Sequence, residues 1–149
     1  MALFYKDLAV IHRIYKDFNY KPYGIDFLCR GSYTIGMRVM IADDDELVRG
    51  FLRRCFERAG CEVEDFSSGA ALLEGFSRRA PDLIVSDFNM PGALNGLKAC
   101  QAIRRAQPSA NIVFITGDPA NVPVIREAGF ERVLAKPFDI EDLDKLVLL

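Results

Sequence analysis

Four short apolar runs, each ended by a polar residue, constrain this chain more than any other feature of its sequence. The runs are Val39–Ala42, Leu83–Ser86, Ile112–Ile115 and Val133–Ala135. The polar residues that follow them are Asp43, Asp44, Asp87, Thr116 and Lys136. Near-continuous apolar runs of this length are typical of parallel strands whose two faces are both covered. Because the carboxyl ends of parallel strands share one crevice, we expect the polar residues to meet there.

Helical periodicity between these runs predicts a doubly wound α/β fold. The expected strands are Arg38–Ala42, Cys61–Phe66, Leu83–Ser86, Ile112–Ile115 and Arg132–Ala135. The expected helices follow Asp43-Asp44, begin near Ser68, run over Gly96–Ala106, lie within Pro119–Ala128 and close the chain at Asp139–Leu149. Five strands that alternate with helices predict a five-stranded parallel sheet of flavodoxin-like strand order 2-1-3-4-5.

Three of these elements carry more specific expectations. The first helix, which Gly60 ends, places six apolar residues on one inward face. They are Leu47, Val48, Phe51, Leu52, Cys55 and Phe56. The segment Cys61–Phe66 mixes polar and apolar residues, as an edge strand would. The helix within Pro119–Ala128 is expected to be truncated, because Pro119 and Pro123 interrupt its pattern.

A break in composition at Met37 divides the chain into an N-terminal extension, residues 1–36, and one domain, residues 37–149. All five tyrosines and the only histidine precede the break. Apolar residues recur at helical spacing over residues 3–18, which suggests an amphipathic helix that binds a partner or a second copy. The other interpretation is a mis-assigned start, with Met37 as the true first residue. The sequence leaves both open.

Bulk properties exclude several classes of protein. The formal net charge is −2, so nothing in the overall charge suggests direct nucleic-acid binding. No apolar run reaches the roughly 18 residues of a membrane span, and charged residues interrupt the N-terminus where a secretory signal would be apolar. The four cysteines lack metal-ligand spacing and suggest reduced thiols. These features are typical of a cytoplasmic protein.

The residues at the strand ends have the chemistry of a phosphoryl-transfer site. Asp43, Asp44 and Asp87 offer hard carboxylate oxygens of the kind that Mg²⁺ prefers. Asp87 could act as a nucleophile toward phosphorus, while Lys136 and a metal ion would neutralise charge on the transferring group. Thr116 would donate a hydrogen bond to a phosphoryl oxygen. The backbone carbonyl of Asn89, two residues after Asp87, is placed to complete the metal site. Taken alone, the acidic run Asp43–Glu46 could instead be a helix-start charge cluster.

These motifs, in this order, resemble the receiver domain of two-component response regulators. The resemblance covers Met37–Leu149 and rests on Asp43-Asp44, Asp87 with Asn89-Met90-Pro91, Thr116-Gly117 and Lys136-Pro137-Phe138. It implies that Asp87 accepts phosphate from a histidine kinase or a histidine phosphotransfer domain. It implies that Asp44, Asp87 and the Asn89 carbonyl bind Mg²⁺ directly, with Asp43 helping through water. Thr116 and Lys136 would then sense the phosphoryl group.

The resemblance also implies how such a protein would work. It would catalyse only its own phosphorylation and dephosphorylation, and it would not be an enzyme in the usual sense. Because no output domain follows Leu149, we expect a stand-alone receiver that signals by protein contact within a phosphorelay. A receiver module separated from a hybrid histidine kinase is the alternative within the family.

Three features depart from the usual receiver pattern. The loop Pro91–Gly96 is one residue longer than the common form, as in receivers attached to hybrid kinases. The interval between Thr116 and Lys136 is short. Val133 stands three residues before the lysine, where many receivers have an aromatic switch residue. The usual aromatic readout of phosphorylation is therefore in doubt.

Other function classes fit the sequence less well. A phosphatase resembling the haloacid dehalogenase group would use Asp43 as its nucleophile, but it would leave Asp87 and the Asn89-Met90-Pro91 motif without a role. A pseudo-receiver used only for docking would not need the complete acidic set. A dinucleotide-binding domain is disfavoured, because no glycine-rich loop follows the first strand.

Overall fold

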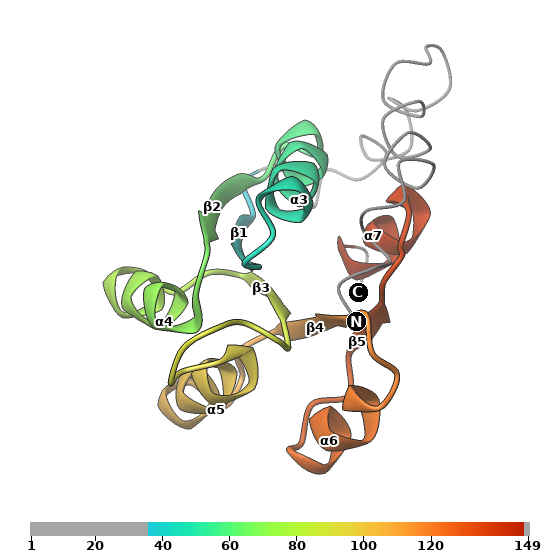
Figure 1. The fold of residues 1–149 in the computed structure, drawn as a ribbon. Helices are drawn as coiled ribbons and strands as arrows, with labels where there is room; N and C mark the ends of the chain where they lie inside the picture. Colours follow the sequence, from blue (N-terminus) through green and yellow to red (C-terminus); the bar gives the residue numbers. More distant parts are fainter. Residues whose placement is uncertain (1–35, 148–149) are drawn as a thin grey trace.

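The computed structural model of the protein describes residues 36–147, which form a five-stranded parallel sheet with helices on both faces (Figure 1). In chain order the elements are β1 (Arg38–Ala42), α3 (Glu46–Arg58), β2 (Glu62–Phe66), α4 (Gly69–Arg78), β3 (Leu83–Asp87), α5 (Gly96–Ala106), β4 (Ile112–Thr116), α6 (Asn121–Glu127), β5 (Val133–Ala135) and α7 (Ile140–Val147). The helix expected over residues 3–18 and the two interpretations of the extension lie outside the described residues.

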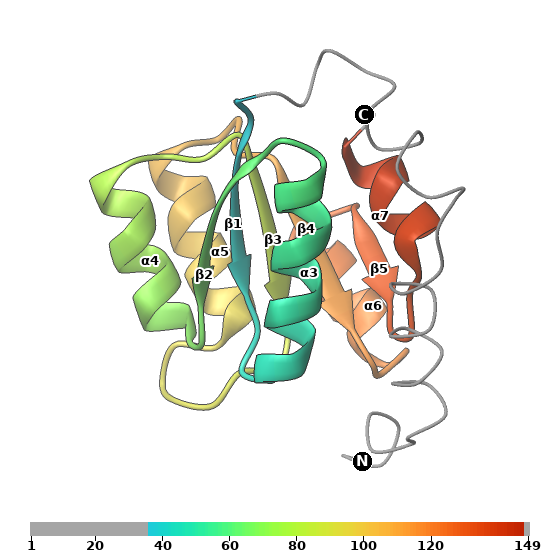
Figure 2. The same cartoon turned by 90° about the horizontal axis from the view of Figure 1, so that it is seen from above.

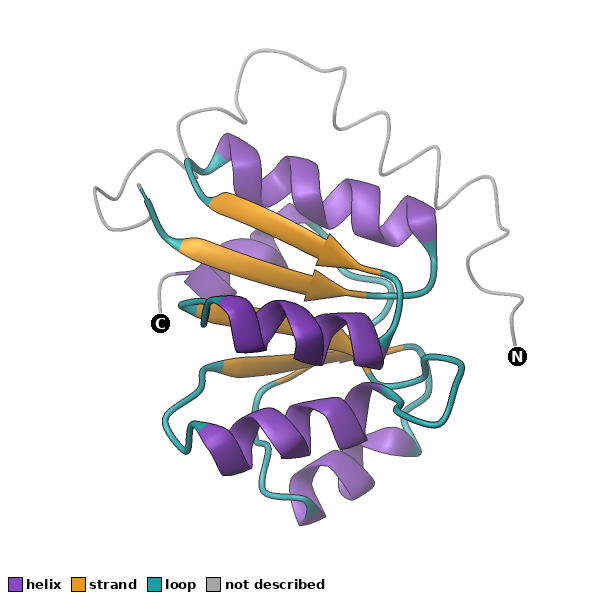
Figure 3. Cartoon of the chain, turned by 90° about the vertical axis from the view of Figure 1, so that its left-hand side faces the viewer, coloured by secondary structure: helices purple, strands orange, loops and turns teal. Residues whose placement is uncertain are grey.

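The strand order is β2-β1-β3-β4-β5, as the sequence predicts, and all neighbouring strands run parallel. The predicted strands agree with the observed ones to within one residue at each end. Every residue of β1, β3 and β4 is buried, whereas β2, at the edge of the sheet, has one buried residue, Val63, and four exposed or half-buried ones. The strand arrowheads point to one side of the molecule, where the loops that carry the polar residues gather (Figure 3).

The two faces of the sheet bury separate hydrophobic clusters, because successive strand residues point to opposite faces. Val39 and Ile41 of β1 pack into the cluster formed with α3 and α7. Met40 and Ala42 of the same strand pack into the cluster formed with α4, α5 and α6. Figure 2 shows the sheet between these two helical layers. The doubly wound architecture predicted from the sequence is confirmed.

The inward face predicted for the first helix is correct except at Leu47, which is 54% exposed. The other five residues of the predicted face are buried: Val48, Phe51, Leu52, Cys55 and Phe56. Leu47 is the second residue of α3 and lies about 100° around the helix from Val48, at the margin of the apolar stripe. In the first helical turn that margin faces away from the sheet.

Helix α6 is short, as the two prolines predict, but it forms in spite of Pro123. Pro123 is the third residue of the seven-residue helix. The first four N–H groups of a helix have no intrahelical partner, so a proline there removes no helical hydrogen bond. Ile125 is the buried residue of this helix, which therefore has less packing than its neighbours.

None of the helices in residues 36–147 combines the length and the apolar composition that crossing a membrane requires.

The start of α5 is packed against the end of β3 so closely that only glycine fits. A Cβ atom built at Gly96 would lie 1.8 Å from the carbonyl oxygen of Asp87 and 3.1 Å from the hydroxyl of Ser86. Gly50, inside α3, has nothing within 4 Å of its Cβ position. The absent side chain of Gly96 therefore fixes how α5 approaches the strand that carries Asp87.

We expect Gly96→Ala to destabilise the fold and Gly50→Ala to stabilise it. The first change forces a methyl group into backbone and should lower the unfolding free energy by about 1–3 kcal/mol. The second removes backbone freedom from a helix interior and should raise that energy by about 0.5–1 kcal/mol. Chemical denaturation of the two variants and the native protein measures both. Equal stability of the two variants would contradict the close packing at Gly96.

Candidate phosphoryl-transfer site

Three carboxylates meet at the carboxyl edge of the sheet, as the strand ends predict. Asp43 and Asp44 follow β1, and Asp87 is the last residue of β3. One oxygen from each lies within 4.8 Å of the others. Asp43 and Asp87 are buried, whereas Asp44 is exposed. The group is therefore open to solvent on the side of Asp44 and closed behind the other two.

Two residues of the acidic run after β1 have different structural roles. One carboxylate oxygen of Asp43 accepts a hydrogen bond from the backbone N–H of Asp45, with an N···O distance of 2.8 Å. Asp45 itself caps α3, because its side chain accepts from the N–H groups of Leu47 and Val48. The helix-start interpretation is thus correct for Asp45 and does not apply to buried Asp43.

Lys136 connects the two buried carboxylates. Its ammonium nitrogen lies 2.8 Å from a carboxylate oxygen of Asp43 and 3.5 Å from one of Asp87. The lysine side chain is itself 7% exposed, and the Lys136–Pro137 peptide bond is cis. Lys136 starts two strands away from β3, at the end of β5, so a long side chain is needed to reach Asp87.

Burial and crowding disfavour ionisation of the buried carboxylates. The pKa of Asp87 is raised to about 7, first by burial and then by the charge of Asp43, against the opposing attraction of Lys136. Burial likewise raises the pKa of Asp43, although Lys136 and the Asp45 N–H lower it in part. An added positive charge in this pocket would favour the ionised form of both carboxylates.

The other two predicted site residues lie at the same edge. Thr116 ends β4 and is buried. It is one residue beyond Ile115, the β4 partner of Asp87 in the register. Its hydroxyl is hydrogen-bonded to Asp118 and Asn121. Asn89 is exposed in the loop that follows β3.

Four residues that the sequence analysis did not assign to the site also contribute to it. Arg49 donates a hydrogen bond to the backbone carbonyl of Asp43, with an N···O distance of 2.8 Å. The buried hydroxyl of Ser86 donates to the carbonyl of Asp87. Gly96 approaches that same carbonyl, and Asn121 donates to Thr116. No spacing pattern marks the arginine, the serine or the asparagine, because each contact depends on how a side chain turns back onto a neighbouring loop or strand end.

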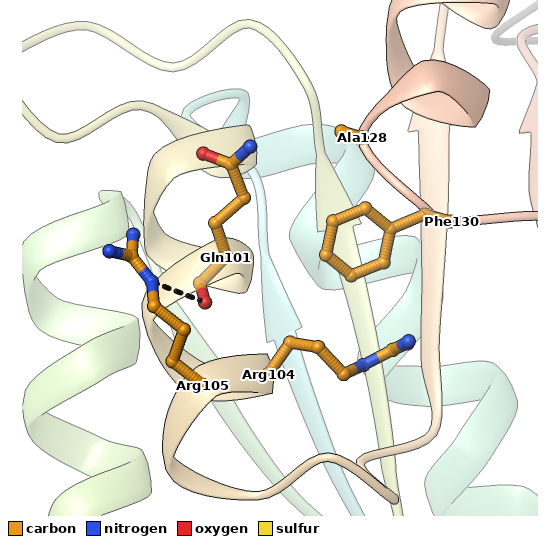
Figure 4. Close-up of a pocket in the computed structure, with 5 residues that line it drawn as sticks. All are labelled: Gln101, Arg104, Arg105, Ala128 and Phe130. Carbon is orange, nitrogen blue, oxygen red and sulfur yellow. Dashed lines mark hydrogen bonds between the residues drawn. The ribbon is translucent and has the colours of Figure 1, made fainter.

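A second hollow, of about 230 Å³, lies at the other end of α5 and takes no part in this site. It is lined by Gln101, Arg104, Arg105, Ala128 and Phe130. The guanidinium of Arg104 is 4.7 Å from the centre of the Phe130 ring (Figure 4). Arg105 points away from that ring and donates to the backbone carbonyl of Gln101 (Figure 4).

Comparison with known proteins decides the family. The sequence profile of the response regulator receiver domain matches residues 39–148. The chain belongs to the response regulator receiver family. Receivers are signalling modules, not classical enzymes, and they are partnered with histidine kinases in two-component systems. The haloacid dehalogenase-like alternative does not apply.

Known relatives share the receiver domain but differ in how much of their length this chain covers. The receiver is 32% identical over 111 residues to the response regulator receiver protein CpdR of Brucella abortus, covering 71% of this chain and 89% of that protein. It is 33% identical over 112 residues to the DNA-binding transcriptional regulator NtrC of Escherichia coli. That match covers 73% of this chain and 24% of NtrC, so the chain spans about a quarter of that relative.

Solved structures show the same fold. The chemotaxis response regulator CheY4 of Vibrio cholerae superimposes with a TM-score of 0.69 and 27% identity. The match covers 76% of this chain and 97% of that one.

The residues of the acidic group fit a magnesium ion. The three carboxylates carry three negative charges when ionised, and one ammonium, that of Lys136, contacts them. The resulting excess of two negative charges equals the charge of one divalent cation. Carboxylate oxygens are also the ligands that Mg²⁺ prefers, and its habit of keeping several waters suits the open side at Asp44.

We expect the metal-free receiver to lose stability as the pH rises from about 4 to about 7, relative to Asp87→Asn. The folded state holds a proton on Asp87 that the unfolded state has already lost, so the stabilisation disappears as this carboxylate ionises. The shift of its pKa from 3.8 to about 7 corresponds to a loss on the order of 4 kcal/mol. Chemical denaturation with a chelator across this pH range measures the difference.

The control is Asp139→Asn, which replaces an exposed carboxylate outside the acidic group and keeps a side chain able to cap α7. This variant should follow the pH dependence of the native protein. Parallel curves for the native receiver and Asp87→Asn would show that Asp87 has an ordinary pKa.

Proposed function

We propose that this receiver accepts a phosphoryl group on Asp87 from a phosphohistidine donor and signals by protein contact in a two-component phosphorelay. The observation that carries this is the placement of Asp87. It is a buried carboxylate at a strand end, beside Asp43 and within 3.5 Å of the Lys136 ammonium. A buried acid with a raised pKa beside a cation is typical of a functional site.

The transfer follows from the chemistry of these groups. A carboxylate oxygen of Asp87 attacks phosphorus, the phosphorus–nitrogen bond of the phosphohistidine breaks, and the imidazole leaves with the bonding electrons. Bound Mg²⁺, held by Asp43, Asp44, Asp87 and the backbone carbonyl of Asn89, would supply positive charge that balances the transferring group. Lys136 holds its ammonium beside both buried carboxylates and adds a second positive charge there. Thr116 donates a hydrogen bond to a phosphoryl oxygen once Asp87 is modified.

The partners follow from the family and from the relatives. The donor is a histidine kinase or a histidine phosphotransfer domain, and the phosphorylated receiver acts by binding a downstream protein target. The match to 89% of CpdR supports stand-alone action. A receiver module of a hybrid histidine kinase remains the second arrangement. We also propose residues 37–149 as the receiver, with residues 1–36 as an extension, and the cytoplasm as its location.

The proposal predicts that one phosphoryl group is added at Asp87. Incubation with Mg²⁺ and a small phosphodonor such as acetyl phosphate should raise the intact mass by one phosphoryl group. Asp87→Asn removes the nucleophile and should abolish the increase. Asp139→Asn, a change of the same chemistry at an exposed position, should be phosphorylated like the native protein. Equal phosphorylation of native protein and Asp87→Asn would overturn the assignment.

The metal site predicts that Mg²⁺ stabilises the native fold. At about 100 times its dissociation constant, Mg²⁺ should raise the unfolding free energy by roughly 2.7 kcal/mol, because it binds the folded carboxylate group and hardly binds the unfolded chain. Asp44→Ala removes a ligand and should lose most of this gain. Glu46→Gln, a nearby exposed acid outside the group, should keep it. Denaturation curves with Mg²⁺ and with chelator decide between them, and an equal gain in Asp44→Ala would contradict the site.

A further inference from the structure

The hydroxyl of Thr116 has no spare hydrogen-bonding capacity in this structure. It donates to the backbone carbonyl of Asp118 and accepts from the backbone N–H of Asp118, both with distances of 3.2 Å. It also accepts from the side-chain amide nitrogen of Asn121 at 2.9 Å. A hydroxyl donates one hydrogen bond and accepts two, so these three interactions use all of its capacity.

A saturated hydroxyl cannot donate to a phosphoryl group on Asp87 without giving up a partner. Its single donated bond, to Asp118, has to break first. Turning the hydroxyl to another staggered position also moves its oxygen away from the amide of Asn121. The Asn121 contact, which is the shortest of the three, therefore opposes the rearrangement that phosphorylation of Asp87 requires.

We propose that Asn121 is a positioning residue that holds the Thr116 hydroxyl away from Asp87 until phosphorylation exchanges this partner for a phosphoryl oxygen. The proposal rests on the function proposed above for Asp87 and Thr116. It also identifies α6 as the helix that this exchange frees from Thr116, because Asn121 is the first residue of α6.

The anchoring of α6 makes it suited to respond. Ala120, which precedes the helix, offers no side-chain cap, and Ile125 is its buried residue. Its first residue is tied to the end of β4 through Asn121 and Thr116, and the Asn121 N–H also donates to the carbonyl of Asp118. When the side-chain contact opens, the start of α6 loses its side-chain tie to Thr116 and keeps its hydrogen bonds to the preceding loop, from the N–H groups of Ala120, Asn121 and Val122.

Val133, at the usual switch position, provides no polar contact that could connect the phosphoryl-transfer site to α6. Val133 is apolar and half-buried in β5, where it packs against the cluster that contains Ile125 of α6. A β-branched side chain of this kind is stiff and carries no hydroxyl. The Thr116–Asn121 contact is thus a polar link that joins the phosphoryl-transfer site to α6.

The first test observes the contact directly. Proton–nitrogen correlation spectra of the labelled full chain contain a side-chain amide pair for Asn121, identified by its loss in Asn121→Ala. Beryllofluoride with Mg²⁺, a non-covalent mimic of a phosphoryl group on a carboxylate, is the probe. We expect the Asn121 pair to shift and to exchange faster with water when the probe binds. An Asn121 pair unchanged at saturating probe would overturn the proposal.

The second test measures how much the Asn121 contact weakens the binding of beryllofluoride. Without the restraining partner, Asn121→Ala should bind beryllofluoride roughly two- to tenfold more tightly than the native protein, the range expected for loss of one neutral hydrogen bond. Val124→Ala, at an exposed position of the same helix, should bind like the native protein. A double-mutant cycle adds the variants Thr116→Ala and Thr116→Ser, each with and without Asn121→Ala.

The cycle separates positioning from a general effect on the helix. The tightening by Asn121→Ala should persist with Thr116→Ser, which keeps the hydroxyl, and should vanish with Thr116→Ala. Tightening that survives Thr116→Ala, or no tightening at all while the native protein binds the probe, would overturn the role of Asn121 alone. A native protein that takes up neither beryllofluoride nor a phosphoryl group would overturn the proposed function. The role of Asn121, which rests on that function, would fall with it.

Discussion

The ammonium of Lys136 between two buried carboxylates is the interaction on which the rest of the site depends. Asp43 is completely buried, and an isolated ionised carboxylate there would carry a large desolvation cost. Lys136 offsets part of that cost at 2.8 Å and reaches Asp87 at 3.5 Å. The contact also ties the end of β5 to the ends of β1 and β3, across the intervening β4. Strand order and side-chain length together make this contact possible.

Crowding of the three carboxylates disfavours the metal-free fold, and the proposed cation would relieve it. Burial and the charge of Asp43 raise the pKa of Asp87 to about 7. The same crowding leaves an excess of negative charge that one ammonium does not balance. A site arranged in this way favours binding of a divalent cation, since the ion relieves repulsion that the folded chain cannot relieve alone. The crowding that destabilises the metal-free pocket is thus also the physical reason for proposing a cation there.

Rigid and adaptable parts meet at the end of β4. The strands beneath the site are fully buried, and Gly96 packs α5 directly on the backbone of Asp87. Helix α6, by contrast, has a single buried side chain and begins with a polar contact to Thr116. The proposed change at Thr116 would therefore be transmitted more easily to α6 than to α5. This difference in packing suits a module that changes one face while its core stays fixed.

The amino-acid sequence was enough to predict the strands, their order and which polar residues meet at the carboxyl edge of the sheet. Apolar runs such as Val39–Ala42 have no other way to be buried on both faces, and polar residues that end parallel strands must share an edge. It misplaced Leu47, because periodicity does not decide which residues at the margin of an apolar stripe are covered. Only the tertiary structure separated buried Asp43 from Asp45, which caps α3.

The sequence predicted that Lys136 and the carboxylates meet, but not which individual side-chain contacts form. The reach of Lys136 to Asp43 spans 93 positions along the chain. The contact of Asn121 with Thr116 depends on how the loop after β4 turns into α6. Such contacts follow from the packing of whole elements, whereas burial pattern and strand polarity follow from local sequence. The side-chain contacts decide how the site residues are held in place. The burial pattern and the strand direction decide at which edge of the sheet the site lies.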